Sequence, residues 1–149
     1  MPVDFVWRLL LAAGLGAAVG LEREYRQKPA GLRTNILIAL GSALFTIMSA
    51  AMVQPGVDPS RIAAQIVTGI GFLGGGAIMR NRDTVHGMTT AATIWVNAAI
   101  GVAAGTGQYS LATFTAALTL VVLIVLPPIE SYFERRAGWP ERHRPPTDR

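Results

Sequence analysis

The sequence predicts an all-α membrane protein with five transmembrane helices, the N-terminus outside and the C-terminus in the cytoplasm. Three observations predict this. Five apolar runs of near-spanning length divide the chain, short connections separate them, and basic residues gather in alternate connections. The chain is 51% hydrophobic and 15% charged, with a formal net charge of +4. Basic residues between apolar runs are typical of a cytoplasmic membrane face and argue against a nucleic-acid partner.

Each run has about 17–19 residues, or roughly 25–29 Å of helix, which just crosses a hydrocarbon core of about 30 Å. The first run is followed by EREYR and not by a cleavage site, so we interpret it as a retained helix. The runs are Phe5–Leu21, Asn35–Val53, Ile62–Met79, Thr89–Gly105 and Tyr109–Leu126.

The connections carry recognisable helix signals. The first helix is expected to continue through Gln27, because Glu22 and Arg26 form an i, i+4 pair, and Lys28-Pro29 then stops it. Pro55-Gly56 predicts a turn.

Asp58 with Pro59 predicts the N-cap and first position of the third helix. The four residues GTGQ allow only a tight hairpin between the fourth and fifth helices, and Pro127-Pro128 predicts the end or a kink of the fifth. Residues 1–130 therefore form the transmembrane domain, and residues 131–149 a basic, partly disordered cytoplasmic tail.

Orientation follows from the positive-inside rule, which places Lys and Arg in the cytoplasm. Only Arg8 and Arg61 fall on the opposite side. If any single run failed to span, basic groups would fall on opposite sides, whereas five spans bring all three groups together. Those groups are Arg23, Arg26, Lys28 and Arg33; Arg80 and Arg82; and Arg135 and Arg136.

Small residues predict where helices approach closely. Three glycine pairs have GxxxG spacing: Gly16/Gly20, Gly71/Gly75 and Gly101/Gly105. The glycine-rich stretch Arg61–Arg80 also contains Gly74, and Ala64, Thr68, Gly71 and Gly75 share one helix face. Two uses of this stretch are open: tight helix packing, or a broken helix that exposes carbonyls to a ligand.

Few polar side chains lie within the runs. Thr90, Thr93 and Asn97 share one face of the fourth helix, and Gln65 and Thr68 lie at a similar depth on the third. The short connection between these helices favours their being neighbours, which predicts a hydrogen bond from Asn97 to Gln65 or Thr68. That pair could fix helix rotation or form a binding site.

The sequence contains no cysteine, no GxxxxGK[ST] loop and no nucleophile–base pair. Charged residues occur only at the ends of the apolar runs, whereas a pump or proton-coupled carrier generally has one near the membrane midplane. We therefore expect no enzymatic activity, no cofactor and no metal site.

At the cytoplasmic face, Glu22 and Glu24 emerge on the same side as Arg33, Arg80 and Arg82. This predicts an ion-pair network between the two inner loops. Exposed pairs contribute only about 0–1 kcal/mol each, so we interpret the network as a docking surface for a partner.

Three segments, EREYRQKPAGLRTN, RIAAQIVTGIGFLGGGAIMR and HGMTTAATIWVNAAIGVAAGTGQY, resemble the MgtC/SapB family of bacterial inner-membrane proteins. The resemblance spans nearly all of the apolar chain. Matching positions are Glu22, Arg26, Gly31, Arg33, Arg61, Gln65, Gly71, Gly74, Thr90 and Trp95.

The resemblance implies a multi-pass inner-membrane protein linked to low-Mg²⁺ adaptation and virulence. It further implies action through contact with other membrane proteins, among them the membrane subunit of the F-type ATP synthase. The larger relatives carry a soluble C-terminal domain that this chain does not show. The rival hypothesis is a small oligomeric channel or carrier for Mg²⁺ or another cation, and a homo-oligomer is compatible with either.

Overall fold

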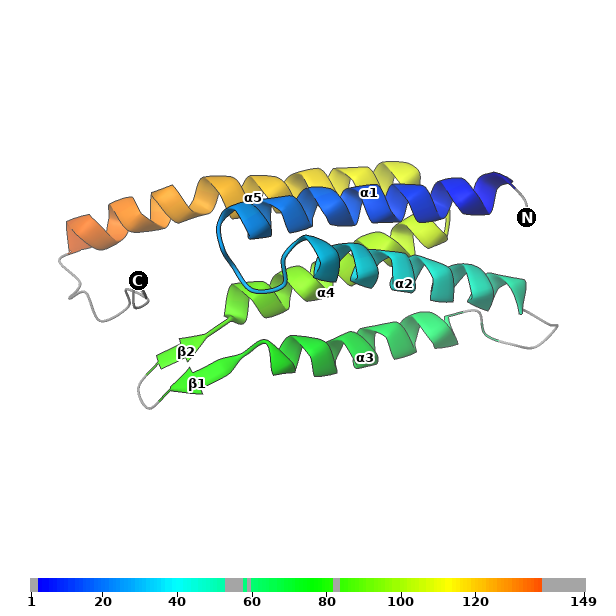
Figure 1. The fold of residues 1–149 in the computed structure, drawn as a ribbon, viewed down its shortest axis with the longest axis horizontal. Helices are drawn as coiled ribbons and strands as arrows, with labels where there is room; N and C mark the ends of the chain where they lie inside the picture. Colours follow the sequence, from blue (N-terminus) through cyan, green and yellow to red (C-terminus); the bar gives the residue numbers. More distant parts are fainter. Residues whose placement is uncertain (1–2, 53–57, 59, 82–83, 138–149) are drawn as a thin grey trace.

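The structure is a computed structural model that describes residues 3–52, 58, 60–81 and 84–137. Five helices and one small hairpin make up the described fold (Figure 1). The helices are α1 Val3–Tyr25, α2 Leu32–Ala51, α3 Arg61–Gly76, α4 Met88–Gly105 and α5 Tyr109–Ala137, and the strands are β1 Met79–Asn81 and β2 Thr84–His86. The all-helical membrane fold predicted from the sequence is confirmed.

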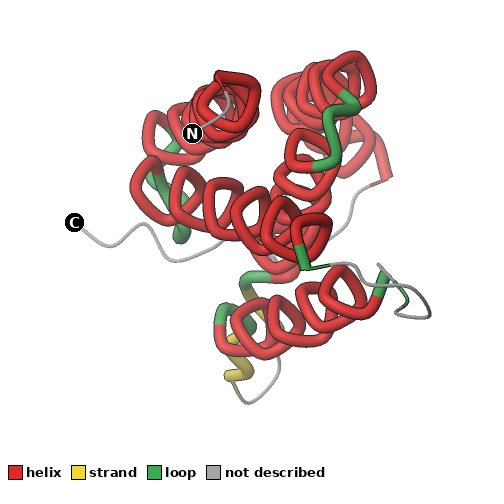
Figure 2. The backbone as a smooth tube through the Cα atoms, turned by 90° about the vertical axis from the view of Figure 1, so that its right-hand side faces the viewer, coloured by secondary structure: helices red, strands yellow, loops and turns green. Residues whose placement is uncertain are grey.

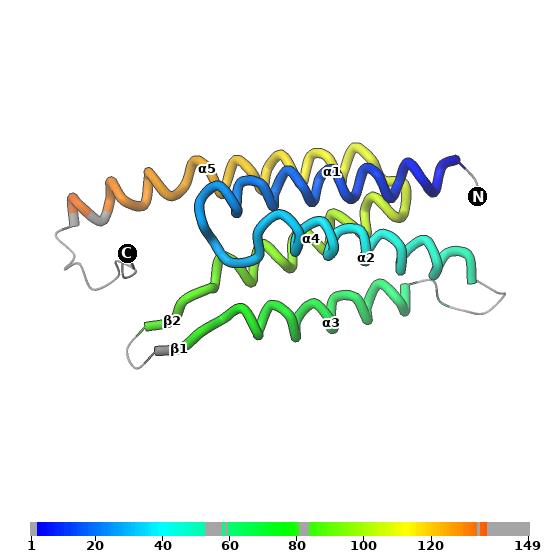
Figure 3. Tube along the Cα trace, viewed as in Figure 1, coloured from blue at the N-terminus to red at the C-terminus, as the bar shows by residue number. Residues whose placement is uncertain are grey.

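The helices run up and down along one long axis (Figure 1). The α1–α2 loop, the β hairpin and the end of α5 lie at one end, here called the hairpin end. The start of α1 and the α4–α5 turn lie at the other, the N-terminal end (Figure 3). The three basic groups predicted to share a side therefore lie at the hairpin end, except Arg82 and the tail beyond residue 137, which lie outside the described residues.

Four helices, α1, α2, α4 and α5, are long and apolar enough to cross a membrane by length and composition. The third is shorter than expected: it ends at Gly76, and Met79 of the predicted run belongs to β1. Its 16 residues correspond to about 24 Å of helix. It packs against α4 and less extensively against α2, and it lies at one edge of the bundle in the end-on view (Figure 2).

The core is built on α2, because glycines from two neighbours approach its backbone. A Cβ added to Gly16 would lie 2.7 Å from the carbonyl oxygen of Asn35, and one on Gly20 would lie 2.7 Å from the Cα of Leu32. On the other side, Gly101 faces the carbonyl of Ala39 and Gly105 that of Ala43. Such contacts exclude any side chain, as expected for small-residue packing between membrane helices.

Several predicted helix ends differ from those observed. The first helix ends at Tyr25, two residues early, because Gln27 takes a positive φ of 52°. The third begins at Arg61 after Ser60, so Asp58 is not its N-cap. The carboxylate of Asp58 instead accepts a hydrogen bond from the backbone N–H of Ser60 at 2.8 Å, which lowers the pKa of Asp58. The predicted turn at Pro55–Gly56 and the predicted first position at Pro59 lie outside the described residues.

The fifth helix continues through Pro127 and Pro128 to Ala137. The prediction that it ends at the two prolines is therefore wrong. The tight turn predicted between the last two helices is present, and Gly107 takes a φ of 81° within it.

Replacing Gly16 with alanine is expected to lower the thermal stability of the purified chain by about 1–3 kcal/mol, because overpacking forces α1 away from α2. Gly14→Ala is the matched control on the same helix, since nothing lies within 4 Å of a Cβ at that position. It should leave stability unchanged or raise it slightly. Melting curves that coincide for the two variants would contradict this account of the core.

Candidate functional site

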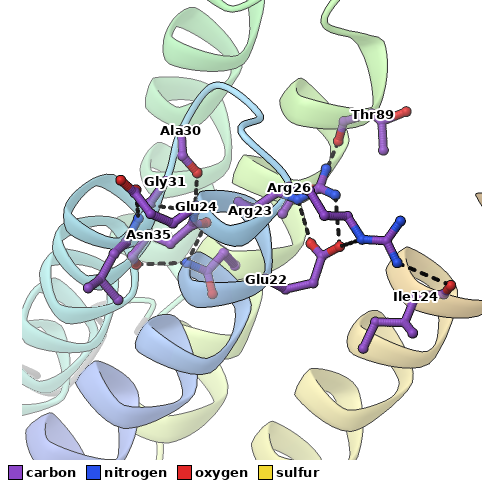
Figure 4. A network of polar contacts seen from close by, with 12 residues as sticks. Glu22, Arg23, Glu24, Arg26, Ala30, Gly31, Asn35, Thr89 and Ile124 are labelled. Atoms are coloured by element: carbon purple, nitrogen blue, oxygen red, sulfur yellow. Dashed lines mark hydrogen bonds and ion pairs between the residues drawn. The ribbon is translucent and has the colours of Figure 1, made fainter.

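A polar cluster lies at the hairpin end of the bundle, where α1, α2, α4 and α5 meet (Figure 4). It consists of Glu22, Arg23, Arg26, Asn35 and Asn97, and is called the polar cluster below. Arg23 is only 4% exposed and the two asparagines are fully buried. Buried charges and amides are costly unless they are paired, so their partners define the site.

Glu22 binds Arg23 of α1 and Arg26, the first residue after that helix. Its carboxylate accepts from Nε of Arg23 at 2.7 Å and forms an i, i+4 ion pair with Nε of Arg26, also at 2.7 Å. The Glu22–Arg26 pair predicted from the sequence is confirmed. The guanidinium of Arg23 points toward Thr89 at the start of α4 (Figure 4).

Arg26 also connects α1 to α5. Its Nη2 donates to the carbonyl oxygen of Ile124 at 3.4 Å. In a regular helix that carbonyl would accept the N–H of the residue four positions later, which is Pro128 and has none. Arg26 thus supplies a donor to a carbonyl that proline leaves free, as neighbouring helices do for prolines within membranes.

Asn97 bonds to α2 and not to α3, so the predicted hydrogen bond to Gln65 or Thr68 is wrong. Its Nδ2 donates to the backbone oxygen of Asn35 at 2.7 Å and to Oδ1 of Asn35 at 3.1 Å. The cause is helix rotation: Asn97 shares a face with Gly101 and Gly105, and their contact with α2 turns that face toward Asn35.

Asn35 in turn holds the entry to α2. Its Nδ2 donates to the backbone oxygens of Ala30 and of Gly31, the latter at 3.0 Å. Because Gly31, the N-cap of α2, has no side chain to cap the helix, the hydrogen bonds of Asn35 fix the chain path there. The amide pair therefore links the α1–α2 loop to the middle of α4.

The predicted network between the inner loops is not formed by the described residues. Glu22 pairs within α1, and Glu24 accepts the backbone N–H of Leu32 at 3.1 Å. Arg33 and Arg80 are exposed and take part in no ion pair among the described residues. Each glutamate binds partners close to it in the sequence, because it can reach them without extending across to the β hairpin.

The other predicted site residues are not brought together. Arg61, Gln65, Thr68 and Trp95 are exposed, and Thr68 donates to the carbonyl of Ala64 in its own helix at 3.2 Å. Thr90 is buried on the face of α4 that carries Asn97. Among the described residues, no group of three or more His, Asp or Glu side chains is placed to hold a metal ion.

The glycines of α3 differ from those of α1 and α4. No described atom lies within 4 Å of a Cβ at Gly71 or Gly75, so the close contact predicted there is not made by the part of the chain that the structure describes. Gly74 is buried and faces Ala91, whose carbonyl oxygen lies 3.7 Å from the added Cβ. The helix is continuous from Arg61 to Gly76, so the alternative of a helix broken within this range is wrong, while packing of these glycines against another chain stays a prediction.

A second cluster, at the N-terminal end, was missed in the sequence. Arg8 pairs with Asp4 at 2.5 Å and donates to the carbonyl of Gly105 at 2.9 Å, while the Tyr109 hydroxyl donates to Asp4 at 2.5 Å. These contacts fasten the start of α1 to the α4–α5 turn. The i, i+4 spacing of Asp4 and Arg8 was a signal for their pairing; nothing local indicated Tyr109.

Replacing Asn97 with leucine should destabilise the chain by about 1–3 kcal/mol, because two buried acceptors on Asn35 lose their donor. The matched control is Gln65→Leu, since Gln65 is an exposed amide with no hydrogen bond among the described residues. Thermal melting in detergent measures both. Equal melting temperatures would show that the amide pair is not what holds α4 against α2.

The role of Arg26 can be tested against Pro128 in a double-mutant cycle. Arg26→Ala alone should destabilise the chain, because the Ile124 carbonyl loses its donor. Pro128→Ala restores a backbone donor for that carbonyl, so Arg26→Ala should cost less in that background, with a coupling of about 0.5–3 kcal/mol. Additive effects on stability would mean that Arg26 and the proline act independently.

The chain matches the MgtC family over residues 9–132. It is 49% identical over 132 residues to YhiD of Escherichia coli (strain K12), which is named there as a candidate magnesium transporter; the match covers 84% of this chain and 61% of YhiD. It is 51% identical over 119 residues to Protein MgtC of Salmonella typhimurium (strain 14028s / SGSC 2262), covering 80% of this chain and 49% of MgtC.

A third relative, the uncharacterised protein slr0014 of Synechocystis sp. (strain ATCC 27184 / PCC 6803 / Kazusa), is 46% identical over 129 residues, covering 87% of this chain and 55% of slr0014. No solved structure matches. The chain thus spans about half to three fifths of the length of these relatives. With the family match and the four candidate spans together, the chain belongs to the MgtC family and is a multi-pass membrane protein.

Proposed function

We propose that the chain crosses the bacterial inner membrane five times, with the N-terminus outside. The path of the chain supports this, because α2 and α4 run in the same direction and α3 runs in the opposite direction, from the end of α2 toward the start of α4 (Figure 1). The basic residues described at the hairpin end support a cytoplasmic location for it. In this arrangement residues 1–130 form the membrane domain and residues 131–149 a cytoplasmic tail.

We further propose that the protein is not an enzyme and acts by contact with other membrane proteins. One observation carries the proposal. GxxxG pairs in α1 and α4 are filled by the backbone of α2, whereas the pair at Gly71 and Gly75 is left open on an exposed face of α3. Ala64, Thr68, Gly71 and Gly75 all lie on this face, which is called the small-residue stripe below.

The glycine pairs of α1 and α4 thus each pack against the backbone of another helix of the same chain. At the small-residue stripe the helix would come from another molecule, either a different membrane protein or a second copy of this chain. The name of YhiD and the resemblance to low-Mg²⁺ and virulence proteins support a role for this contact in magnesium homeostasis. The membrane subunit of the F-type ATP synthase is the first partner to test.

The alternative is a Mg²⁺ or cation transporter, which is favoured by the name of YhiD. A cation path through this bundle would need a line of oxygen ligands. The backbone of α3 forms a continuous helix, and α2 closes the glycine faces of α1 and α4. A path would therefore have to form between copies of the chain.

Leucine at Gly71 should abolish function while leaving the amount of protein in the membrane unchanged, because it blocks the small-residue stripe at a position where an added Cβ has no described atom within 4 Å. Function is measured as restored growth in low Mg²⁺ of a strain that lacks its own family member. A photoreactive residue at Ala64 should crosslink to the partner helix, and Gly71→Leu should remove the crosslink.

Gly14→Leu serves as the control, since it also projects into open space but on α1. Crosslinks between two copies would identify the partner as a second chain. Full growth with Gly71→Leu, or Mg²⁺ entry into liposomes that contain only the purified chain, would contradict contact with a partner as the mechanism.

A further inference from the structure

A large groove lies between α2 and α3. Its volume is about 1380 Å³, above the roughly 300–1,000 Å³ typical of pockets for drug-sized ligands. Buried Ile38, Ile66, Ile70 and Ile94 line it, and the rim extends to Gly71 and Gly75. The lining includes Thr34, Ile38 and Phe45 of α2 and Gln65, Gly69 and Gly76 of α3.

Hydrocarbon suits this groove better than water. The polar side chains of its lining are Thr34, Ser42 and Gln65, and ordered water needs several polar partners at each position. Nothing lies within 4 Å of a Cβ at Gly69 or Gly76, so the chain itself does not fill the space. An empty groove would forfeit dispersion contacts along its whole length.

On α2 the groove is about as long as one leaflet is thick, whereas on α3 it follows nearly the whole helix. On α2 it runs from Thr34 to Phe45, about 16 Å at 1.5 Å per residue, and on α3 from Ile62 to Ala77, about 22 Å. Both lengths are shorter than the hydrocarbon core of about 30 Å. A spanning partner helix would need contacts along that whole core, whereas a single acyl chain would not.

The groove has a basic mouth at the hairpin end. The basic mouth consists of Lys28, Arg33 and Arg80, which are all exposed. Along the sequence each is within three residues of a groove-lining residue, namely Ala30, Thr34 or Ala77. None takes part in an ion pair among the described residues. Glu22 is paired with Arg23 and Arg26, and Glu24 accepts the backbone N–H of Leu32, next to Arg33. This arrangement provides positive charge and the Thr34 hydroxyl where an acyl chain would leave the groove.

We propose that the α2–α3 groove binds one anionic phospholipid of the cytoplasmic leaflet. An acyl chain lies against Ile38 and Gly69, and the phosphate lies at the basic mouth beside Arg33. Basic pockets between transmembrane helices on the cytoplasmic side are known to bind anionic head groups. The inference rests on the proposed membrane orientation but needs no partner protein. The groove is lined by Ile66, Gly69 and Ile70 of α3, and its rim also includes Gly71 and Gly75 of the small-residue stripe.

The experiment uses the purified full chain in phosphatidylethanolamine vesicles that contain a small fraction of phosphatidylglycerol with a photoreactive acyl chain. Mass spectrometry then maps the labelled residues. Labelling should be several-fold higher on the groove residues of α2 and α3 than on α1 and α5. The same reactive chain on phosphatidylethanolamine should show no such preference.

Native mass spectrometry measures retained lipid in variants. Arg33→Gln should weaken phosphatidylglycerol retention about fivefold, as expected for one basic residue near an anionic head group, and Arg135→Gln should not. Gly69→Leu should remove the groove labelling, while Gly14→Leu keeps it; Gly76→Leu is the second groove variant should Gly69→Leu fail to accumulate.

Three results would overturn the proposal. Even labelling of all membrane-facing helices would mean bulk lipid only. Displacement of the lipid by inorganic phosphate would mean a site for the free anion. Absence of groove labelling together with dimers of the purified chain in native mass spectrometry would mean that a second copy fills the groove. None of these measurements involves a partner protein, so failure here leaves the proposed function standing.

Discussion

The backbone of α2 is approached at close range from two sides, and the rest of the structure depends on this contact. Glycines of α1 meet it at Leu32 and Asn35, and glycines of α4 meet it at Ala39 and Ala43. Hydrophobic burial gives little drive between helices in lipid, so such contacts must come from close packing and hydrogen bonds. They fix the rotation of α1 and α4, which places Asn97 against Asn35 and puts Arg26 within reach of α5.

The sequence predicted the packing glycines of α1 and α4 but not the helix that they approach. GxxxG spacing identifies a face, and only the three-dimensional arrangement says what lies opposite it. Asn97 illustrates the difference: the short connection to α3 favoured Gln65 as its partner, while the shared face with Gly101 and Gly105 decided for Asn35. Giving that spacing more weight than loop length would have corrected the prediction.

The prolines of α5 were misjudged for a related reason. A local rule ends a helix at two consecutive prolines, since each lacks an N–H and disfavours a helical residue before it. In this fold a tertiary contact compensates, because Arg26 donates to the freed carbonyl of Ile124. Likewise Glu22 was recognised through its i, i+4 pair. The burial of Arg23 could not be predicted, because residue spacing within α1 does not show which of its faces α2 and α4 cover.

What remains is a helix that the chain itself only partly covers. Ile66, Ile70 and Gly74 are the buried residues of α3, although it contains more glycines than any other helix. Each glycine makes the helix about 1 kcal/mol less favourable than alanine would. Glycines that take part in no close contact would therefore destabilise α3 without improving its packing. The chain leaves two adjoining surfaces of α3 open, one small and flat, the other a groove with a basic mouth. Because natural sequences break local rules mainly where function requires it, these surfaces are where molecules outside the chain are expected to bind.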